Sequence, residues 1–140
     1  KNEIYDTVMS ASPENAIEFF HGYTYSGHPL AAATACATLD VYKKDQLFER
    51  AASLSPHFEN EIHALKVEPN VKDIRNLGLV GGIELVSRDG EVGARAYEVF
   101  LHCFNNGVLV RYTGDILAFS PPLIISAEEI SRIFKTVAEA

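Results

Sequence analysis

The chain has 140 residues, 47% of them hydrophobic and 22% charged, which suits one compact domain around a single hydrophobic core. Its net charge is −7 and its twelve basic residues are scattered, so the sequence argues against a nucleic-acid-binding protein. Because no apolar run approaches the length of a membrane span and no basic, apolar leader opens the chain, we expect no membrane partner.

Regular secondary structure is expected mainly after residue 27. Residues 1–27 show weak periodicity and many loop-forming residues. His28-Pro29 then opens a helix, because proline is well tolerated at the first helical position. The inward face of this helix is predicted from residues at helical spacing, namely Leu30, Ala33, Thr34, Ala37 and Val41.

A second helix is predicted from Asp45 to about Lys66, with Pro56 expected to kink or interrupt it. Its inward residues should be Leu47, Ala51, Leu54, Phe58, Ile62 and Leu65. Residues 72–86 alternate at period 2 and bend at Gly78, which predicts a pair of strands.

The C-terminal third is expected to add a helix, two strands and a last helix. Residues 91–106 have helical spacing and stop at Asn106-Gly107. Residues 108–111 and 116–120 should pair as strands, and Ser126 with Glu129 forms a capping box before the last helix. This order predicts an α+β domain with a mostly antiparallel sheet and helices over one face.

The two cysteines, Cys36 and Cys103, lie on apolar helix faces and have no second Cys or His at metal-ligand spacing. We therefore expect buried free thiols in a reducing, cytoplasmic compartment, with no disulfide and no metal site.

The densest polar cluster is residues 21–29, with the sequence HGYTYSGHP. Hydroxyls and backbone N–H groups that lead into a helix N-terminus suit an anion such as a phosphate. The lysine of a P-loop is absent from this segment. The residues by themselves favour the alternative, a capped turn that feeds a buried helix.

Arg111 follows an apolar segment and precedes a turn, where an arginine can clamp a carboxylate with two hydrogen bonds. The alternative is a surface arginine that is solvated or paired with Asp115. Arg75 has the same ambiguity and is more typical of a structural role. His21 and His28 have no nucleophile or carboxylate at an informative spacing, so the residues predict no catalytic triad.

Three segments together resemble the class III aminotransferases. Residues 21–33 (HGYTYSGHPLAAA) resemble the HG-[FY]-TYSGHP-x-AAA segment of that family, and residues 73–85 (DIRNLGLVGGIEL) resemble its strand pair. Gly107 to Arg111, Gly114-Asp115, and the SPPL of 120–123 with Ser126 and Glu129 resemble its C-terminal pattern. The subgroup that the chain resembles most is the ω-amino acid–pyruvate transaminases.

The resemblance implies a fold-type I pyridoxal phosphate (PLP) enzyme that works as a homodimer. Residues 1–27 would be an edge segment of its large domain, and 28–140 its small C-terminal α+β domain. Tyr23 and Thr24 match the positions that contact the cofactor phosphate of the neighbouring subunit. Arg111 matches the arginine that binds the substrate carboxylate and swings aside for substrates without one. The implied reaction moves an amino group from an amine or ω-amino acid to a keto acid such as pyruvate.

The resemblance also implies that the Schiff-base lysine of the family falls just before Lys1. The six lysines of the chain do not replace it, since none has an evident desolvated pocket. We therefore expect no catalytic residue in the chain, and neither turnover nor firm PLP binding from the chain alone.

Three other interpretations stay open at this point. Within the same superfamily, the chain could belong to an ornithine, GABA or glutamate-semialdehyde type of enzyme. From a different class, it could be a stand-alone regulatory module that binds a small molecule such as an amino acid. It could also be a piece that serves dimerisation alone.

Overall fold

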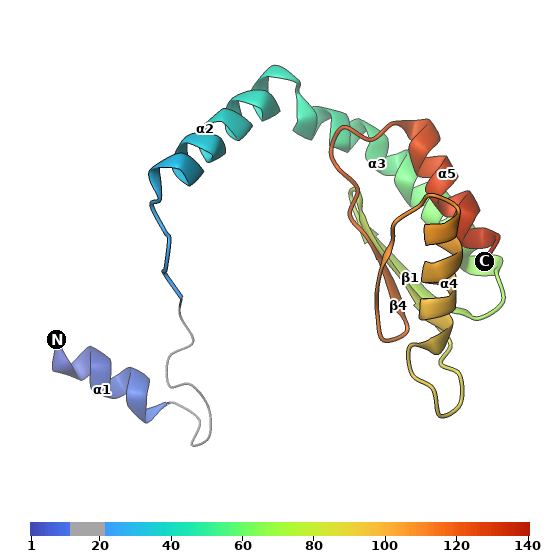
Figure 1. Cartoon of the computed structure of the whole chain (residues 1–140), viewed down its shortest axis with the longest axis horizontal. Helices are drawn as coiled ribbons and strands as arrows, with labels where there is room; N and C mark the ends of the chain where they lie inside the picture. Colours follow the sequence, from blue (N-terminus) through green and yellow to red (C-terminus); the bar gives the residue numbers. More distant parts are fainter. Residues whose placement is uncertain (12–21) are drawn as a thin grey trace. The chain divides into compact units, whose positions relative to one another are not determined.

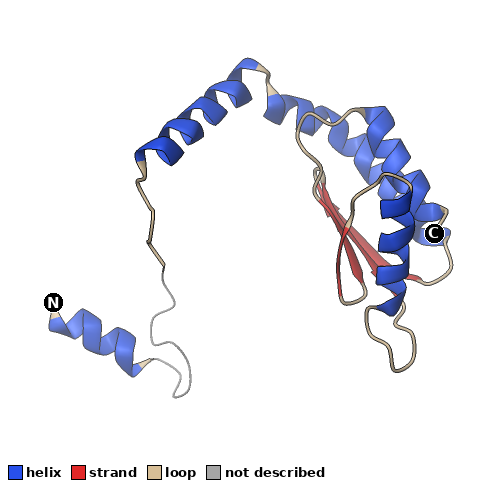
Figure 2. Cartoon of the chain, viewed as in Figure 1, coloured by secondary structure: helices blue, strands red, loops and turns tan. Residues whose placement is uncertain are grey.

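The structure is a computed structural model that describes residues 1–11 and 22–140. It divides into two compact units, Lys1–Leu39 and Asp40–Ala140. In chain order the described elements are α1 (Asn2–Ser10), α2 (Pro29–Lys44), α3 (Leu47–Ala64), η1 (Leu65–Val67), β1 (Val71–Leu77), β2 (Val80–Leu85), α4 (Ala94–Asn105), β3 (Arg111–Thr113), β4 (Ile116–Phe119) and α5 (Ala127–Ala138) (Figures 1 and 2).

The first unit contains α1, which the sequence did not predict, and most of α2, which it did. None of the residues of α2 is buried, so the expected inward face is exposed in these 140 residues. The expectation that Cys36 is buried is therefore wrong, whereas Cys103 is buried as predicted. Among the described residues, no helix is long and apolar enough to cross a membrane.

The second unit is built on an antiparallel sheet of strand order β1-β2-β4-β3, which confirms the predicted α+β class. Ile83 and Leu85 of β2 are buried toward the helices, because alternate residues of a strand point to opposite faces. The opposite face, which we call the open face, carries Glu84, and this carboxylate accepts hydrogen bonds from Lys72 and Arg75 of β1. The helices α3, α4 and α5 thus pack over one face, as expected.

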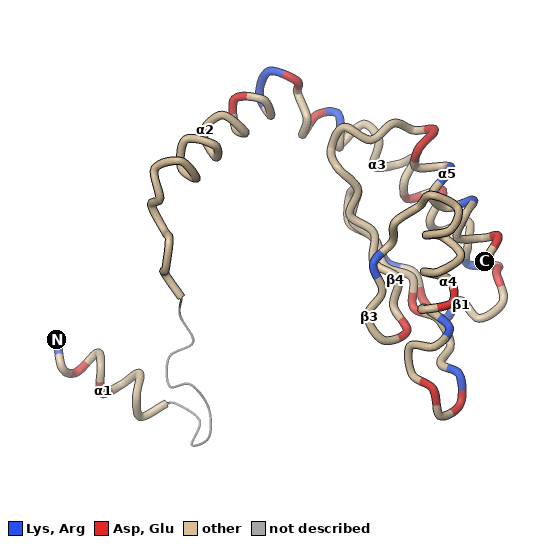
Figure 3. Tube along the Cα trace, in the orientation of Figure 1, with Lys and Arg blue, Asp and Glu red and all other residues tan. Residues whose placement is uncertain are grey.

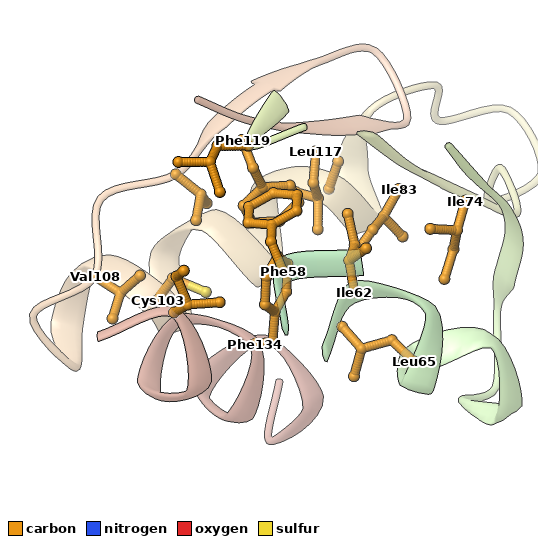
Figure 4. Packing of buried hydrophobic residues seen from close by; sticks show 14 of the residues in the cluster. Phe58, Ile62, Leu65, Ile74, Ile83, Cys103, Val108, Leu117, Phe119 and Phe134 are labelled. Carbon is orange, nitrogen blue, oxygen red and sulfur yellow. The ribbon is translucent and has the colours of Figure 1, made fainter. Parts of the chain in front are cut away.

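The core lies between α3, α5 and the sheet (Figure 4). Phe58 of α3 packs edge-on against Phe134 of α5, with ring centroids 5.1 Å apart. The ring centroid of Phe134 lies 5.2 Å from that of Phe119 of β4. Ile62 and Leu117 beside them are fully buried. Most of the predicted inward residues of α3 are therefore core residues or pack against the core.

The helix α3 runs through Pro56 without interruption. Proline within a helix costs about 3 kcal/mol, because it removes one hydrogen bond and clashes with the preceding turn. Burial of an apolar side chain contributes about 1.5–3 kcal/mol. Phe58 and Ile62, both fully buried after the proline, offset this cost together.

The strand predicted for residues 108–111 is displaced in the structure. The strand β3 begins at Arg111 and pairs with β4 through Arg111–Ala118 and Thr113–Ile116. Val108 and Val110 precede it with buried side chains but outside the ladder. Their apolar character therefore reflects burial in the core and not a strand, because a short apolar run is compatible with both.

The substitution Gly81→Ala should destabilise the chain. A Cβ at Gly81 would lie 2.6 Å from Ile62 Cδ1 and 3.0 Å from Phe58 Cε1, and both side chains are fully buried. Overpacking of this kind typically costs about 1–3 kcal/mol. The free energy of unfolding, measured by urea denaturation, should fall by that amount.

The matched control is Gly82→Ala, on the open face, where the nearest atom would be 3.8 Å from the new Cβ. Equal losses from the two substitutions would contradict the close packing of α3 on β2.

Candidate functional site

The segment singled out as an anion loop forms a tight turn that leads into α2. The amide of Ser26 donates to the carbonyl of Tyr23 at 3.2 Å, and the amide of His28 donates to that of Tyr25, also at 3.2 Å. Tyr25 has a φ of 68° and Gly27 a φ of 76°, so the turn holds a tyrosine in the left-handed region that side chains disfavour. His21, named in the sequence prediction, lies outside the described residues.

This turn has the chemistry of an anion site in its hydroxyls and in the helix that follows. Thr24 and the side chain of Tyr23 are exposed, and the first turn of α2 contains no acidic residue. Figure 3 shows that α2 carries charge only toward its C-terminal end, where Lys43 and Lys44 lie. The first amides of a helix lack intrahelical acceptors, and the helix dipole favours an anion there.

Arg111 is the first residue of β3, at the edge of the sheet. It is exposed and pairs through its backbone with Ala118, whose other neighbour in the ladder is Gly82. No ion pair or side-chain hydrogen bond joins Arg111 to another residue of 1–11 or 22–140. The alternative that Arg111 pairs with Asp115 is therefore wrong.

Arg111 borders a cavity of about 550 Å³. Of the described residues in its lining, Arg111 is the one that carries a charge; the others are Phe58, Phe100, Leu109, Val110, Tyr112, Ala118, Phe119, Ser120, Pro121, Pro122, Ile125 and Ile133. A cation beside an apolar hollow suits a ligand with one carboxylate and a short hydrocarbon part.

The carboxylate of Asp115 binds to Ser87 and Gly93 and not to Arg111. Its carboxylate accepts a hydrogen bond from Ser87 Oγ at 2.6 Å and another from the backbone amide of Gly93 at 2.8 Å. These two bonds, the one from Ser87 first, lower the pKa of Asp115, because they stabilise the charged form. The sequence placed this residue in a motif and offered it as a partner of Arg111, but its hydrogen bonds to distant segments were not predictable from spacing.

None of the six lysines has the surroundings of a lysine that attacks a carbonyl group. All six are exposed. Lys72 Nζ lies 2.6 Å from Glu84 Oε1, and this hydrogen bond raises the pKa of Lys72. A nucleophilic lysine needs the opposite, a lowered pKa in a desolvated pocket.

One polar cluster escaped the sequence prediction, since it joins residues that lie 70 to 74 positions apart in the chain. His57 Nε2 lies 3.0 Å from both Ser131 Oγ and the carbonyl oxygen of Ala127, and Ser131 Oγ donates to Glu61 Oε1 at 2.9 Å. Because a carbonyl only accepts, His57 Nε2 must carry a proton here and cannot take one from Ser131. The cluster therefore joins α3 to α5 and is no catalytic triad.

No cluster of three or more His, Cys, Asp or Glu side chains that could hold a metal ion occurs in residues 1–11 and 22–140. Burial raises the pKa of the Cys103 thiol, so this cysteine is held as an unreactive core residue. The candidate groups are thus the turn at Tyr23 and Thr24, in the first unit, and Arg111, in the second.

The amino-acid sequence matches curated proteins along nearly its whole length. It is 51% identical over 135 residues to the omega-aminotransferase of Caulobacter vibrioides, covering 96% of this chain and 30% of that protein. It is 46% identical over 140 residues to the beta-alanine–pyruvate aminotransferase of Pseudomonas aeruginosa, covering 99% and 31%. The chain thus spans about 30% of the length of these relatives.

Solved structures agree with the sequence matches. The omega transaminase from Pseudomonas jessenii, in complex with PMP, superimposes with a TM-score of 0.76 at 30% identity over 85% of this chain and 28% of that one. A structure described as a transaminase with L-Ala gives a TM-score of 0.78 over 86% and 30%. The profile of the family described as aminotransferase class-III matches residues 1–140. With the fold and the sequence in agreement, the chain belongs to the class III aminotransferase family.

Proposed function

We propose that these 140 residues act as the C-terminal part of an aminotransferase that moves an amino group from an amine or ω-amino acid to a keto acid such as pyruvate. The observation that carries this proposal is Arg111, an arginine without an ion-pair partner in the described residues, beside an apolar cavity. An ω-amino acid and pyruvate each offer a carboxylate to such a group. The names of the similar omega-amino acid and beta-alanine–pyruvate aminotransferases support the same substrate class.

PLP is the cofactor of class III aminotransferases, and it supplies an aldehyde that takes up and releases the amino group. The residues present fit one end of it. The exposed hydroxyl of Thr24, with Tyr23 beside it and the N-terminus of α2 next in the chain, fits the phosphate. The described lysines do not fit the aldehyde end, because all are exposed.

Arg111 would bind and orient the substrate carboxylate. Its guanidinium can donate two parallel hydrogen bonds to the two carboxylate oxygens. The apolar side chains beside it, which include Leu109 and Phe119, would contact the hydrocarbon part of the substrate. A substrate without a carboxylate gains nothing from Arg111, so the residue would set a preference between two classes of amino donor.

The rest of the proposal follows the family. The enzyme would be a cytoplasmic homodimer, in which Tyr23 and Thr24 reach the cofactor phosphate of the neighbouring subunit. Residues 1–27 would belong to the large domain and 28–140 to the small domain. The two compact units of the structure divide at a later point, between Leu39 and Asp40 within α2. The catalytic lysine would lie upstream of Lys1 in the same polypeptide.

The isolated 140-residue chain should show no transamination. It offers a phosphate contact and a carboxylate contact but no buried lysine among the described residues. An assay with PLP, β-alanine and pyruvate should give no alanine above the rate without protein, and titration with PLP should show only very weak binding. Turnover by the chain alone would contradict the proposal.

In the full-length enzyme that carries this chain, Arg111→Gln should impair carboxylate-bearing donors selectively. Loss of a hydrogen-bonded charge pair costs about 1.5–3 kcal/mol, so kcat/KM for β-alanine should fall roughly 10- to 150-fold. The single-turnover rate constant for a primary amine that lacks a carboxylate should change little.

The control is Arg75→Gln, in the same cross-strand row at the opposite edge of the sheet, where Arg75 is paired with Asp73 and Glu84. If each substitution slows the reactions of both donors by the same factor, Arg111 is not the carboxylate-binding residue.

A further inference from the structure

The position of Arg111 depends on the hairpin that carries it. Its side chain has no ion-pair partner in the part of the chain that the structure describes. The strand β3 is three residues long, lies at the sheet edge and pairs only with β4 in the described sheet. A few ladder bonds to one neighbour hold such a strand weakly, so other contacts must keep the hairpin in place.

The turn of the hairpin is bound to two other segments through Asp115. Its carboxylate accepts hydrogen bonds from Ser87 Oγ at 2.6 Å and from the amide of Gly93 at 2.8 Å. Its main-chain carbonyl accepts a third from the amide of Leu85 at 2.8 Å. Asp115 therefore ties the turn to the end of β2, to the loop after it and to the residue that precedes α4.

The turn of the hairpin lies close to Gly93, the residue that precedes α4. Gly93, the N-cap of α4, has a φ of 84°, and a Cβ there would lie 3.2 Å from the carbonyl oxygen of Gly114. A side chain at Gly93 would therefore be crowded by the turn, and the helix N-terminus favours the negative charge of Asp115.

The other end of β3 is held by aromatic packing. Tyr112, next to Arg111, has its ring centroid 5.2 Å from that of Phe100 and 5.7 Å from that of Tyr97, both on α4. Adjacent strand residues lie on opposite faces, so Tyr112 against α4 leaves Arg111 on the open face. The helix α4 therefore contacts the hairpin at two points, Tyr112 and Asp115.

We propose that Asp115 is a positioning residue for Arg111: by fastening the β3–β4 turn to the start of α4, it fixes where the guanidinium meets the substrate carboxylate. The inference rests on the proposed role of Arg111. Bidentate pairing tolerates little displacement, because both hydrogen bonds depend on the plane of the guanidinium. Without the carboxylate of Asp115, the hairpin would keep its ladder, the backbone bond from Leu85 and the packing of Tyr112. Its turn would lose the hydrogen bonds to Ser87 and to Gly93 at the start of α4.

The test compares two amino donors in the full-length holoenzyme. Single-turnover rate constants are measured for β-alanine and for a primary amine that lacks a carboxylate. The readout is the rate constant for β-alanine divided by that for the amine. Asp115→Ala should lower this ratio about tenfold, as expected for a misplaced binding group. Asp115→Asn keeps an acceptor for the Gly93 amide and should restore most of it. An equal loss for both donors would show a merely structural role and overturn the inference.

A binding measurement gives a second readout without turnover. Propionate carries the carboxylate but no amino group, and calorimetry on the holoenzyme gives its dissociation constant. Asp115→Ala should raise that constant about tenfold, in step with the kinetic ratio. An unchanged constant would contradict the inference.

A double-mutant cycle separates failure of this inference from failure of the proposed function. In an Arg111→Gln background, Asp115→Ala should not change the ratio further, because the group that it positions is gone. If Arg111→Gln alone leaves the ratio unchanged, the proposed role of Arg111 fails. If it lowers the ratio but Asp115→Ala does not, only the positioning role fails.

Should Asp115→Ala not fold, Ser87→Ala carries the test. It removes one hydrogen bond to Asp115 and should lower the ratio about two- to threefold. The matched control is Ser53→Ala, an exposed serine on α3 whose hydroxyl donates to its own helix at Arg50. No difference between the two serine variants would overturn the proposal.

Discussion

The contact of α3 with the sheet at Gly81 is the constraint on which the rest of the second unit depends. Phe58 and Ile62 occupy the space that a side chain at this position would need. From there the aromatic contacts continue, from Phe58 to Phe134 of α5 and on to Phe119 of β4. One close approach thus sets the depth at which two helices lie on the sheet.

Because the helices gather on one face, the other face is left for polar groups. A single cross-strand row on that face runs from Arg75 through Gly82 and Ala118 to Arg111. Its two ends differ in chemistry. Arg75 is paired with carboxylates of its own strand and the next, whereas Arg111 has no such partner among the described residues. The same residue type is therefore structural at one edge and available for a ligand at the other.

The chain holds two groups suited to anions, and neither of them is accompanied by a lysine suited to carbonyl chemistry in the described residues. The turn at Thr24 offers hydroxyls and a helix N-terminus, and Arg111 offers a guanidinium beside an apolar cavity. They belong to different compact units, and no described lysine has the surroundings to perform carbonyl chemistry. These features agree with a chain that spans about 30% of the length of its curated relatives.

The sequence by itself determined the α+β class, most helix and strand positions, the capping box at Ser126 and the family, since these depend on local periodicity, local hydrogen bonds and short motifs. It also selected Thr24 and Arg111 as candidates. Only the tertiary structure decided that the strand begins at Arg111, that Cys36 is exposed, and that Asp115 binds Ser87 and Gly93. Those outcomes depend on which distant segments meet, and a local pattern carries no information about a partner 22 or 28 residues away in the chain.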